Sequence, residues 1–319
     1  MTQQPLIAGE IRVDAPEAEK TGKLIEDMEM SDYHAFGDFT KHPDDYVLSK
    51  SMLIKLVDCP ARFRYEYMTE KEEVEKDHLN VGTAVHTLAL EPEKFDDLFY
   101  KIPEGMRRDK RTDEYKRCMA EAGTRSMLTH KDYQNILGMA EALSADPLAR
   151  ALFDGPGYIE SSIFFTHPET RLRLRVRPDW FRKDGKLIIN IKTSHSANPN
   201  LFNDTAANFC YDIGAAMELM AVEQIMGPDP ERNYVLMVIE PSPPHVISVF
   251  DTIRPMTLDN DYDNTRTTYA EAGRARLEKA LSRFIECYQN NDWPGYVSGV
   301  DPMRYPGWMM KRVLETGEV

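Results

Sequence analysis

A short apolar strand that carries an amide and a lysine places the tightest constraint on this chain. In residues 187–192 (Leu-Ile-Ile-Asn-Ile-Lys), alternation puts Asn190 and Lys192 on the same face. A charged group inside such a strand is unfavourable unless it is paired or used. Asp179 lies a short hairpin upstream, across the turn dipeptide Asp184-Gly185. An acid, an oxygen ligand and a lysine that converge at one end of a hairpin predict a divalent-metal site for phosphodiester cleavage.

Further pieces of the sequence surround this pair in a fixed order. They are Leu-Ser-Lys-Ser at 48–51, Gly-Thr-Ala-Val-His at 82–86, Leu-Glu-Pro-Glu-Lys-Phe at 90–95, Glu-Ser-Ser at 160–162, Arg-Pro-Asp at 177–179 and Asp-Trp-Pro at 292–294. Together with Asn190-Ile191-Lys192 they resemble the PD-(D/E)xK nucleases. Their order is similar to that in the nuclease domain of exodeoxyribonuclease VIII (RecE) and its phage and prophage relatives.

The resemblance implies a fold and a metal site. The fold is α/β, with a restriction-endonuclease-like core: a central mixed sheet of about five strands flanked by helices. The expected metal is Mg²⁺, with Mn²⁺ as a substitute, and the expected ligands are His86, Asp179, the side-chain oxygen of Asn190 and the carbonyl of Ile191. Lys192 is expected to position or deprotonate the attacking water, so Lys192, Asp179 and Asn190 form the expected catalytic set.

The resemblance also implies a function. The substrate is the end of linear double-stranded DNA, resected 5′ to 3′ for recombination in the cytoplasm of a bacterial host. The family assembles into homo-oligomeric rings and works with a single-strand annealing protein. On its own, a histidine such as His86 within an apolar helix is more often a hydrogen-bonded core residue than a ligand, and the family context reverses that preference.

Two positions depart from the family pattern. Asn190 stands where the family has an acidic residue, and an amide lacks the negative charge that hard cations favour. Gly214, in the context Tyr211-Asp-Ile-Gly-Ala-Ala, stands where the family tends to have a glutamine. The alternative function is therefore a catalytically inactive relative that binds DNA ends, or a substrate-trapping variant. A second alternative is an acidic scaffold whose motif is accidental.

Several residues have two interpretations. The net charge of −14 argues against coating DNA over the whole surface, but a local basic track can still guide a strand. Candidates are Arg62 and Arg64 between aromatic residues, and Arg173, Arg175 and Arg177 along one strand face. The alternatives are snorkelling arginines in the first case and a solvated strand face in the second. Glu160 is either a further metal-site carboxylate or a partner for one of these arginines, and Gly214 and Tyr211 are supporting candidates.

The domain organisation is expected to be simple. Residues 1–28 are polar and aperiodic and predict a flexible arm, and residues 29–319 predict a single exonuclease-like domain. Helices are expected at 49–67, 79–90, 130–153, 206–226 and 263–290, with a polar loop from 193 to 208. The four scattered cysteines indicate reduced, buried thiols, and no apolar run approaches the ~18 residues of a membrane span. The chain is expected to be soluble, with no membrane partner.

Overall fold

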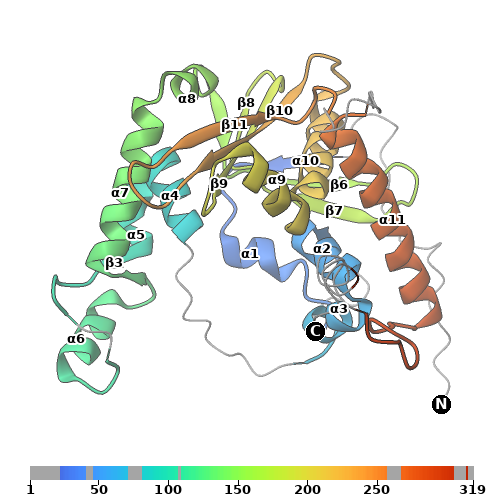
Figure 1. Cartoon of the computed structure of the whole chain (residues 1–319), viewed down its shortest axis with the longest axis horizontal. Coiled ribbons are helices and arrows are strands. Elements are labelled where there is room, and N and C mark those ends of the chain that lie inside the picture. Colours follow the sequence, from blue (N-terminus) through green and yellow to red (C-terminus); the bar gives the residue numbers. More distant parts are fainter. Residues whose placement is uncertain are drawn as a thin grey trace.

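The chain is described by a computed structural model at residues 22–40, 46–70, 81–106, 109–256, 267–304 and 314. Figure 1 shows strands through the middle of the molecule, with α4 and α7 to one side and α2 and α11 to the other. This is the α/β arrangement of a mixed sheet flanked by helices that the sequence predicts.

The central sheet has five strands in the order β11-β10-β9-β8-β5. Their bounds are β5 Gly157–Ile159, β8 Trp180–Arg182, β9 Leu187–Thr193, β10 Asn233–Ile239 and β11 Ile247–Asp251. β9 pairs parallel with β10 and antiparallel with β8, so the sheet is mixed. The predicted hairpin joins β8 to β9, and Gly185 in its turn has a φ of +74° that favours glycine.

A second sheet, which the sequence did not predict, lies beside the first. Its order is β1-β6-β7-β2, with bounds β1 Gly22–Ile25, β2 Leu48–Ser49, β6 Ser162–Thr166 and β7 Arg173–Val176. β3 Phe99–Lys101 and β4 Ser126–Leu128 form a short parallel pair. Residues 22–25 of the expected arm are thus a strand, paired antiparallel with β6. Residues 1–21 of that arm lie outside the described residues.

The helices follow the apolar periodicity of the sequence in most places. Their bounds are α1 Met30–Ala35, α2 Lys50–Asp58, α3 Pro60–Tyr67, α4 Val81–Leu90, α5 Phe95–Leu98 (after a 3₁₀ turn, η1 Pro92–Lys94), α6 Asp113–Ala122, α7 His130–Ala145, α8 Pro147–Leu152, α9 Pro199–Asn208, α10 Tyr211–Met226 and α11 Tyr269–Asn290. None of the helices in the described part of the chain combines the length and the apolar character needed to cross a bilayer. All four cysteines are buried and free of disulfides, as expected.

The expected polar loop before α10 is wrong, because α9 forms there. The side chain of Asn198 accepts a hydrogen bond from the backbone N–H of Asn200 and caps α9, and Pro199 occupies its first turn. Cys210, with a φ of +53°, separates α9 from α10. The final helix begins at Tyr269, and Thr268 forms its capping box; the expected start at residue 263 lies outside the described residues.

Alternation along β9 divides the hydrophobic core into two clusters. Ile188 packs in the larger cluster with residues of α2, α10 and α11, whereas Ile189 and Ile191 pack in a second cluster with residues of α4 and α7. α10 and α11 approach closely at Gly273, where a Cβ atom would lie 2.0 Å from the backbone oxygen of Asp212. The end of β9 that carries Asn190 and Lys192 is therefore held between two packed helical layers.

Candidate metal centre and its buried surroundings

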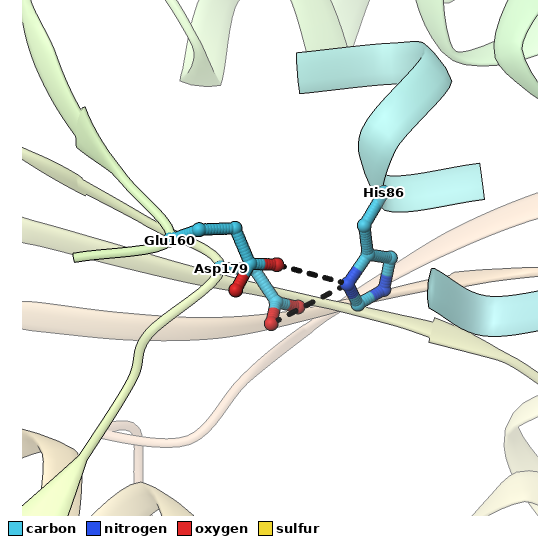
Figure 2. Close-up of side chains that lie close together, drawn as sticks. All are labelled: His86, Glu160 and Asp179. Atoms are coloured by element: carbon cyan, nitrogen blue, oxygen red, sulfur yellow. Dashed lines mark ion pairs between the residues drawn. The ribbon is translucent and has the colours of Figure 1, made fainter. Parts of the chain in front are cut away.

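Three side chains from separate elements converge at this end of the central sheet. His86 comes from α4, Glu160 from the turn between β5 and β6, and Asp179 from the residue before β8. The Nδ1 atom of His86 lies 3.5 Å from Oε1 of Glu160 and 3.5 Å from Oδ1 of Asp179, as Figure 2 shows. One ligand atom from each residue lies within 4.8 Å of the other two. We call this group the metal triad.

Backbone geometry holds the two carboxylates of the metal triad in place. Glu160 has a φ of +42°, a left-handed conformation that is uncommon for a side chain of this size. Its backbone N–H donates to the carbonyl of Asp179 at 3.1 Å, and its Oε2 accepts from Nε of Arg177 at 3.2 Å. Oδ2 of Asp179 accepts from the backbone N–H of Ile191 at 2.6 Å. Strained residues cluster at functional sites, and here the strain orients an acid.

The ring of His86 lies between the triad carboxylates and β9. Its Nε2 atom is 3.1 Å from the carbonyl oxygen of Ile191, so in the neutral ring Nε2 carries the proton and donates it. The lone pair of Nδ1 then faces Glu160 and Asp179. Burial lowers the pKa of His86, but the neighbouring carboxylates outweigh burial and raise it above its ordinary value. A proton and a cation therefore compete for the same nitrogen.

Lys192 donates hydrogen bonds to the two oxygens of β9 that were expected to be metal ligands, the side-chain oxygen of Asn190 and the carbonyl of Ile191. The distance from Nζ of Lys192 to the carbonyl oxygen is 3.2 Å. Glu160 joins His86 and Asp179 in the metal triad, and ligation of a cation by Asn190 and Ile191 stays a prediction. Burial is the largest influence on Lys192 and lowers the pKa of its amine. Its ammonium also lies 5.5 Å from the ring centre of Tyr211.

A second acid, which the sequence analysis missed, lies behind Asn190. Glu218 on α10 is 1% exposed, and both of its carboxylate oxygens accept from Nδ2 of Asn190, at 3.3 and 3.2 Å. The hydroxyl of Tyr234 donates to it at 3.1 Å, and Nζ of Lys50 lies 3.4 Å away. A glutamate within the otherwise apolar run 213–222 was the available signal, because a charge in a buried helix needs a partner or a role.

The expected basic track along β7 is wrong at Arg175, which is 2% exposed and donates to the carbonyl of Val47 at 2.8 Å. Arg173 likewise donates to the carbonyl of Tyr46 at 3.0 Å. Arg177 donates to the carbonyl of Met28 at 2.8 Å and pairs with Glu160, which bears out the second interpretation of that acid. These arginines join distant segments to the sheet.

The first pair of candidate arginines is exposed. Arg62 pairs with Asp58 at 3.2 Å, and its guanidinium lies 5.5 Å from the ring centre of Tyr296. Arg64 is exposed on the same helix, α3. Contact of Arg62 and Arg64 with DNA stays a prediction.

Comparisons with known proteins identify the family of the chain. Residues 49–306 match the family described as a PDDEXK-like domain of unknown function, DUF3799. The chain belongs to this family. The match includes the whole metal triad as well as Lys192 and Glu218. It supports the PD-(D/E)xK nucleases as a group, and the more specific resemblance to exodeoxyribonuclease VIII stays a prediction.

One solved structure supports the fold of this DUF3799 chain. A crystal structure from Eubacterium rectale, named "Putative exonuclease", superposes with a TM-score of 0.56 at 13% sequence identity and covers 92% of this chain and 99% of that one. Such low identity bears on the fold alone. A second structure, SSO0001, reaches a TM-score of 0.26 at 12% identity over 73% of this chain and 85% of that one, too low to inform the fold. No curated protein matches the chain.

Proposed function

We propose that this DUF3799 chain is a metal-dependent exodeoxyribonuclease that acts on the ends of linear double-stranded DNA. The observation that carries the proposal is the convergence of the metal triad with Lys192 at one end of β9, within a PD-(D/E)xK fold. The name of the Eubacterium rectale structure adds support for an exonuclease. Resection from 5′ to 3′ during recombination rests on the family resemblance.

The metal triad fits a divalent cation. Two carboxylates and an imidazole nitrogen within 4.8 Å of one another supply hard oxygen donors and one borderline donor, a set that suits Mg²⁺ and Mn²⁺. When bound, such a cation would neutralise charge on the scissile phosphate and acidify a water molecule. His86, Glu160 and Asp179 would hold it. Mg²⁺ is our proposal for the physiological cation, with Mn²⁺ as its substitute.

The chain's own residues supply the remaining requirements. Burial lowers the pKa of Lys192, which favours the neutral amine, the form that can accept a proton from the attacking water. In its protonated form the same group donates to a developing negative charge. Asp179 is fixed by the backbone N–H of Ile191, and Glu160 by Arg177, so neither carboxylate has to reorganise before the reaction.

The proposed partners follow from the substrate. With a net charge of −14, the chain needs a local basic surface to approach DNA, and the exposed Arg62 and Arg64 are the proposed contacts. Homo-oligomerisation around the duplex, cooperation with a single-strand annealing protein and a bacterial cytoplasmic location belong to the same proposal and rest on the resemblance.

A second candidate function is binding of DNA ends without cleavage. It is favoured by Asn190, which stands at the usual acidic position and is already engaged by Lys192 and Glu218. Both functions require binding of DNA ends, and only the exonuclease requires cleavage. A measurement of DNA digestion therefore distinguishes them.

The test uses end-labelled linear duplex DNA with Mg²⁺, with Mn²⁺ and with EDTA, and closed circular duplex as the control. An exonuclease is expected to degrade the linear duplex only when a cation is present and to leave the circle intact. Asp179→Asn should remove the digestion while retaining end binding. Retained end binding with no digestion in either cation would establish the second function, and the absence of both would refute a nucleic-acid role.

A further inference from the structure

Glu218 is a buried acid that the metal triad does not use. A carboxylate at 1% exposure pays a large desolvation penalty unless hydrogen bonds and an opposite charge compensate for it. Both are present: Asn190 and Tyr234 donate to it, and the ammonium of Lys50 lies 3.4 Å away. Burial raises the pKa of Tyr234 well above its ordinary value, so its hydroxyl stays protonated as a donor. The network is built around a negative charge on α10.

Asn190 joins this charge to Lys192. Its Nδ2 donates to Glu218 and its Oδ1 accepts from Nζ of Lys192, which fixes the orientation of the amide. An ionised aspartate at position 190 has no donor and would place a second carboxylate within about 3 Å of the first, where like charges oppose ionisation. Position 190 therefore suits an amide because position 218 is an acid.

Gly214 makes the counter-ion possible. A Cβ atom at this position would lie 2.6 Å from Cδ of Lys50, which reaches past Gly214 toward Glu218. The two departures from the nuclease pattern, Asn190 and Gly214, thus meet in one network. The amide of Asn190 donates to Glu218, and the absence of a side chain at Gly214 leaves space for Lys50.

We propose that Glu218 is a positioning residue of the nuclease site. It supplies from α10 the negative charge that the motif usually carries at position 190, and the amide of Asn190 transmits its hold to Lys192. This inference rests on the proposed function. If Asn190 simply impaired the motif, restoring an acid at position 190 would raise activity. Our proposal predicts the opposite: Asn190→Asp alone should not raise activity.

The test moves the negative charge from position 218 to position 190 in the full chain. The variants are Glu218→Gln, Asn190→Asp and the double variant Asn190→Asp/Glu218→Gln, with Glu223→Gln on the same helix as the control. Three quantities are measured: Mn²⁺ affinity by calorimetry, the pH profile of linear-duplex digestion, and urea unfolding of the metal-free protein. Unfolding of the metal-free protein reports a charge at the site independently of metal affinity.

Glu218→Gln is expected to lower Mn²⁺ affinity and digestion by roughly 10- to 100-fold, the size of effect seen when a partner outside the ligand set is lost, because it removes a negative charge near the metal triad and the hold on Lys192. Asn190→Asp should give no gain. The double variant should recover most of the loss and the wild-type pH profile, and Glu223→Gln should match the wild type. Unfolding free energies should show the same recovery, because both single variants change the charge of the network.

Opposite outcomes are distinguishable. An active wild type whose Asn190→Asp variant is faster, or whose double variant is no better than Glu218→Gln, overturns the inference and leaves the proposed function standing. A wild type that neither binds Mn²⁺ nor digests DNA overturns both. If Glu218→Gln does not fold, the double variant decides: a folded, Mn²⁺-binding protein supports the exchange, and an unfolded one refutes it.

Discussion

Substitution of Gly214 by alanine tests the buried network through the sign of a stability change. In the interior of a helix, glycine to alanine normally stabilises a protein by about 1 kcal/mol. Here the added Cβ would lie 2.6 Å from Cδ of Lys50. Carbon atoms in contact are about 3.5–4.0 Å apart, so the lysine chain has to retreat by roughly 1 Å.

The retreat should break the pair that Lys50 makes with Glu218. That pair is already 3.4 Å long, and a further ångström exceeds hydrogen-bonding distance. Removing the partner of a fully buried charge costs about 3–5 kcal/mol. The side chain of Lys50 is 30% exposed, so solvent offsets part of this and we take about 2 kcal/mol. Gly214→Ala should therefore destabilise the metal-free protein by about 1 kcal/mol net.

Urea unfolding followed by circular dichroism in EDTA measures this quantity, and an unchanged m-value shows that the unfolded states are comparable. The matched control is Gly214→Ala in a Lys50→Ala background, where Cδ is absent and the normal gain of about 1 kcal/mol should return. Stabilisation of the single variant by about that amount would refute the reasoning, since Lys50 would then have moved without loss.

Three further predictions concern the metal triad and the buried arginine. Asp179→Asn should weaken Mn²⁺ binding by roughly 10- to 100-fold in calorimetry with little change in unfolding free energy, because the amide oxygen can still accept the backbone hydrogen bond. Since the pKa of His86 is raised in the fold, its protonation stabilises the metal-free protein fully below the unfolded pKa of about 6.5, and this contribution is lost as pH rises through the folded pKa. Mn²⁺ affinity should increase as pH rises over the same range. Urea unfolding and calorimetry at a series of pH values measure the two effects, and both pH dependences should be absent in His86→Gln. Arg175→Met should lower the unfolding free energy by about 1.5–3 kcal/mol through the lost bond to Val47 and leave the salt slope of DNA binding unchanged, whereas a slope reduced by about one would show a phosphate contact.

Local patterns in the sequence were sufficient for the hairpin of β8 and β9 and for most helices. The alternation in 187–192 and the Asp184-Gly185 turn determine a hairpin because strand parity and turn conformation are properties of neighbouring residues. The faces of that strand were also predictable. What covers each face was not, because the covering helices α4 and α10 are distant in sequence.

Alternation along β7 predicts which face its arginines share, but not what those arginines contact. The sequence places Arg173 and Arg175 on one face, and that is correct, but it does not show that residues 46 and 47 lie over them. The partner carbonyls are separated from the arginines by more than a hundred residues along the chain. A row of charges at alternate positions looks the same whether it is solvated, binds phosphate or joins two segments.

Glu160 illustrates a different limit. Its side chain reaches the metal triad because the backbone adopts a φ of +42°, a conformation that residue preferences alone would assign to glycine or asparagine. The hydrogen bond from its N–H to the carbonyl of Asp179 helps to hold that conformation, and it depends on the pairing of β5 with β8, which are separated along the chain. Two interpretations of Glu160 were open in the sequence, and the structure supports both at once, since one oxygen faces His86 and the other faces Arg177.

The peptide groups of Ile191 explain how an acid could move from β9 to α10 without disturbing the metal triad. The N–H of Ile191 holds Asp179, and its carbonyl meets both His86 and Lys192. These contacts are made by backbone that β8 and β10 flank on either side, so they do not depend on the side chain at position 190. On our proposal an acid at 190 would contribute charge, and Glu218 supplies that charge through the amide of Asn190, which contacts both Glu218 and the amine of Lys192. On this reasoning the identity of residue 190 alone is a weak indicator of activity in this chain, and the pair formed by positions 190 and 218 is the informative one.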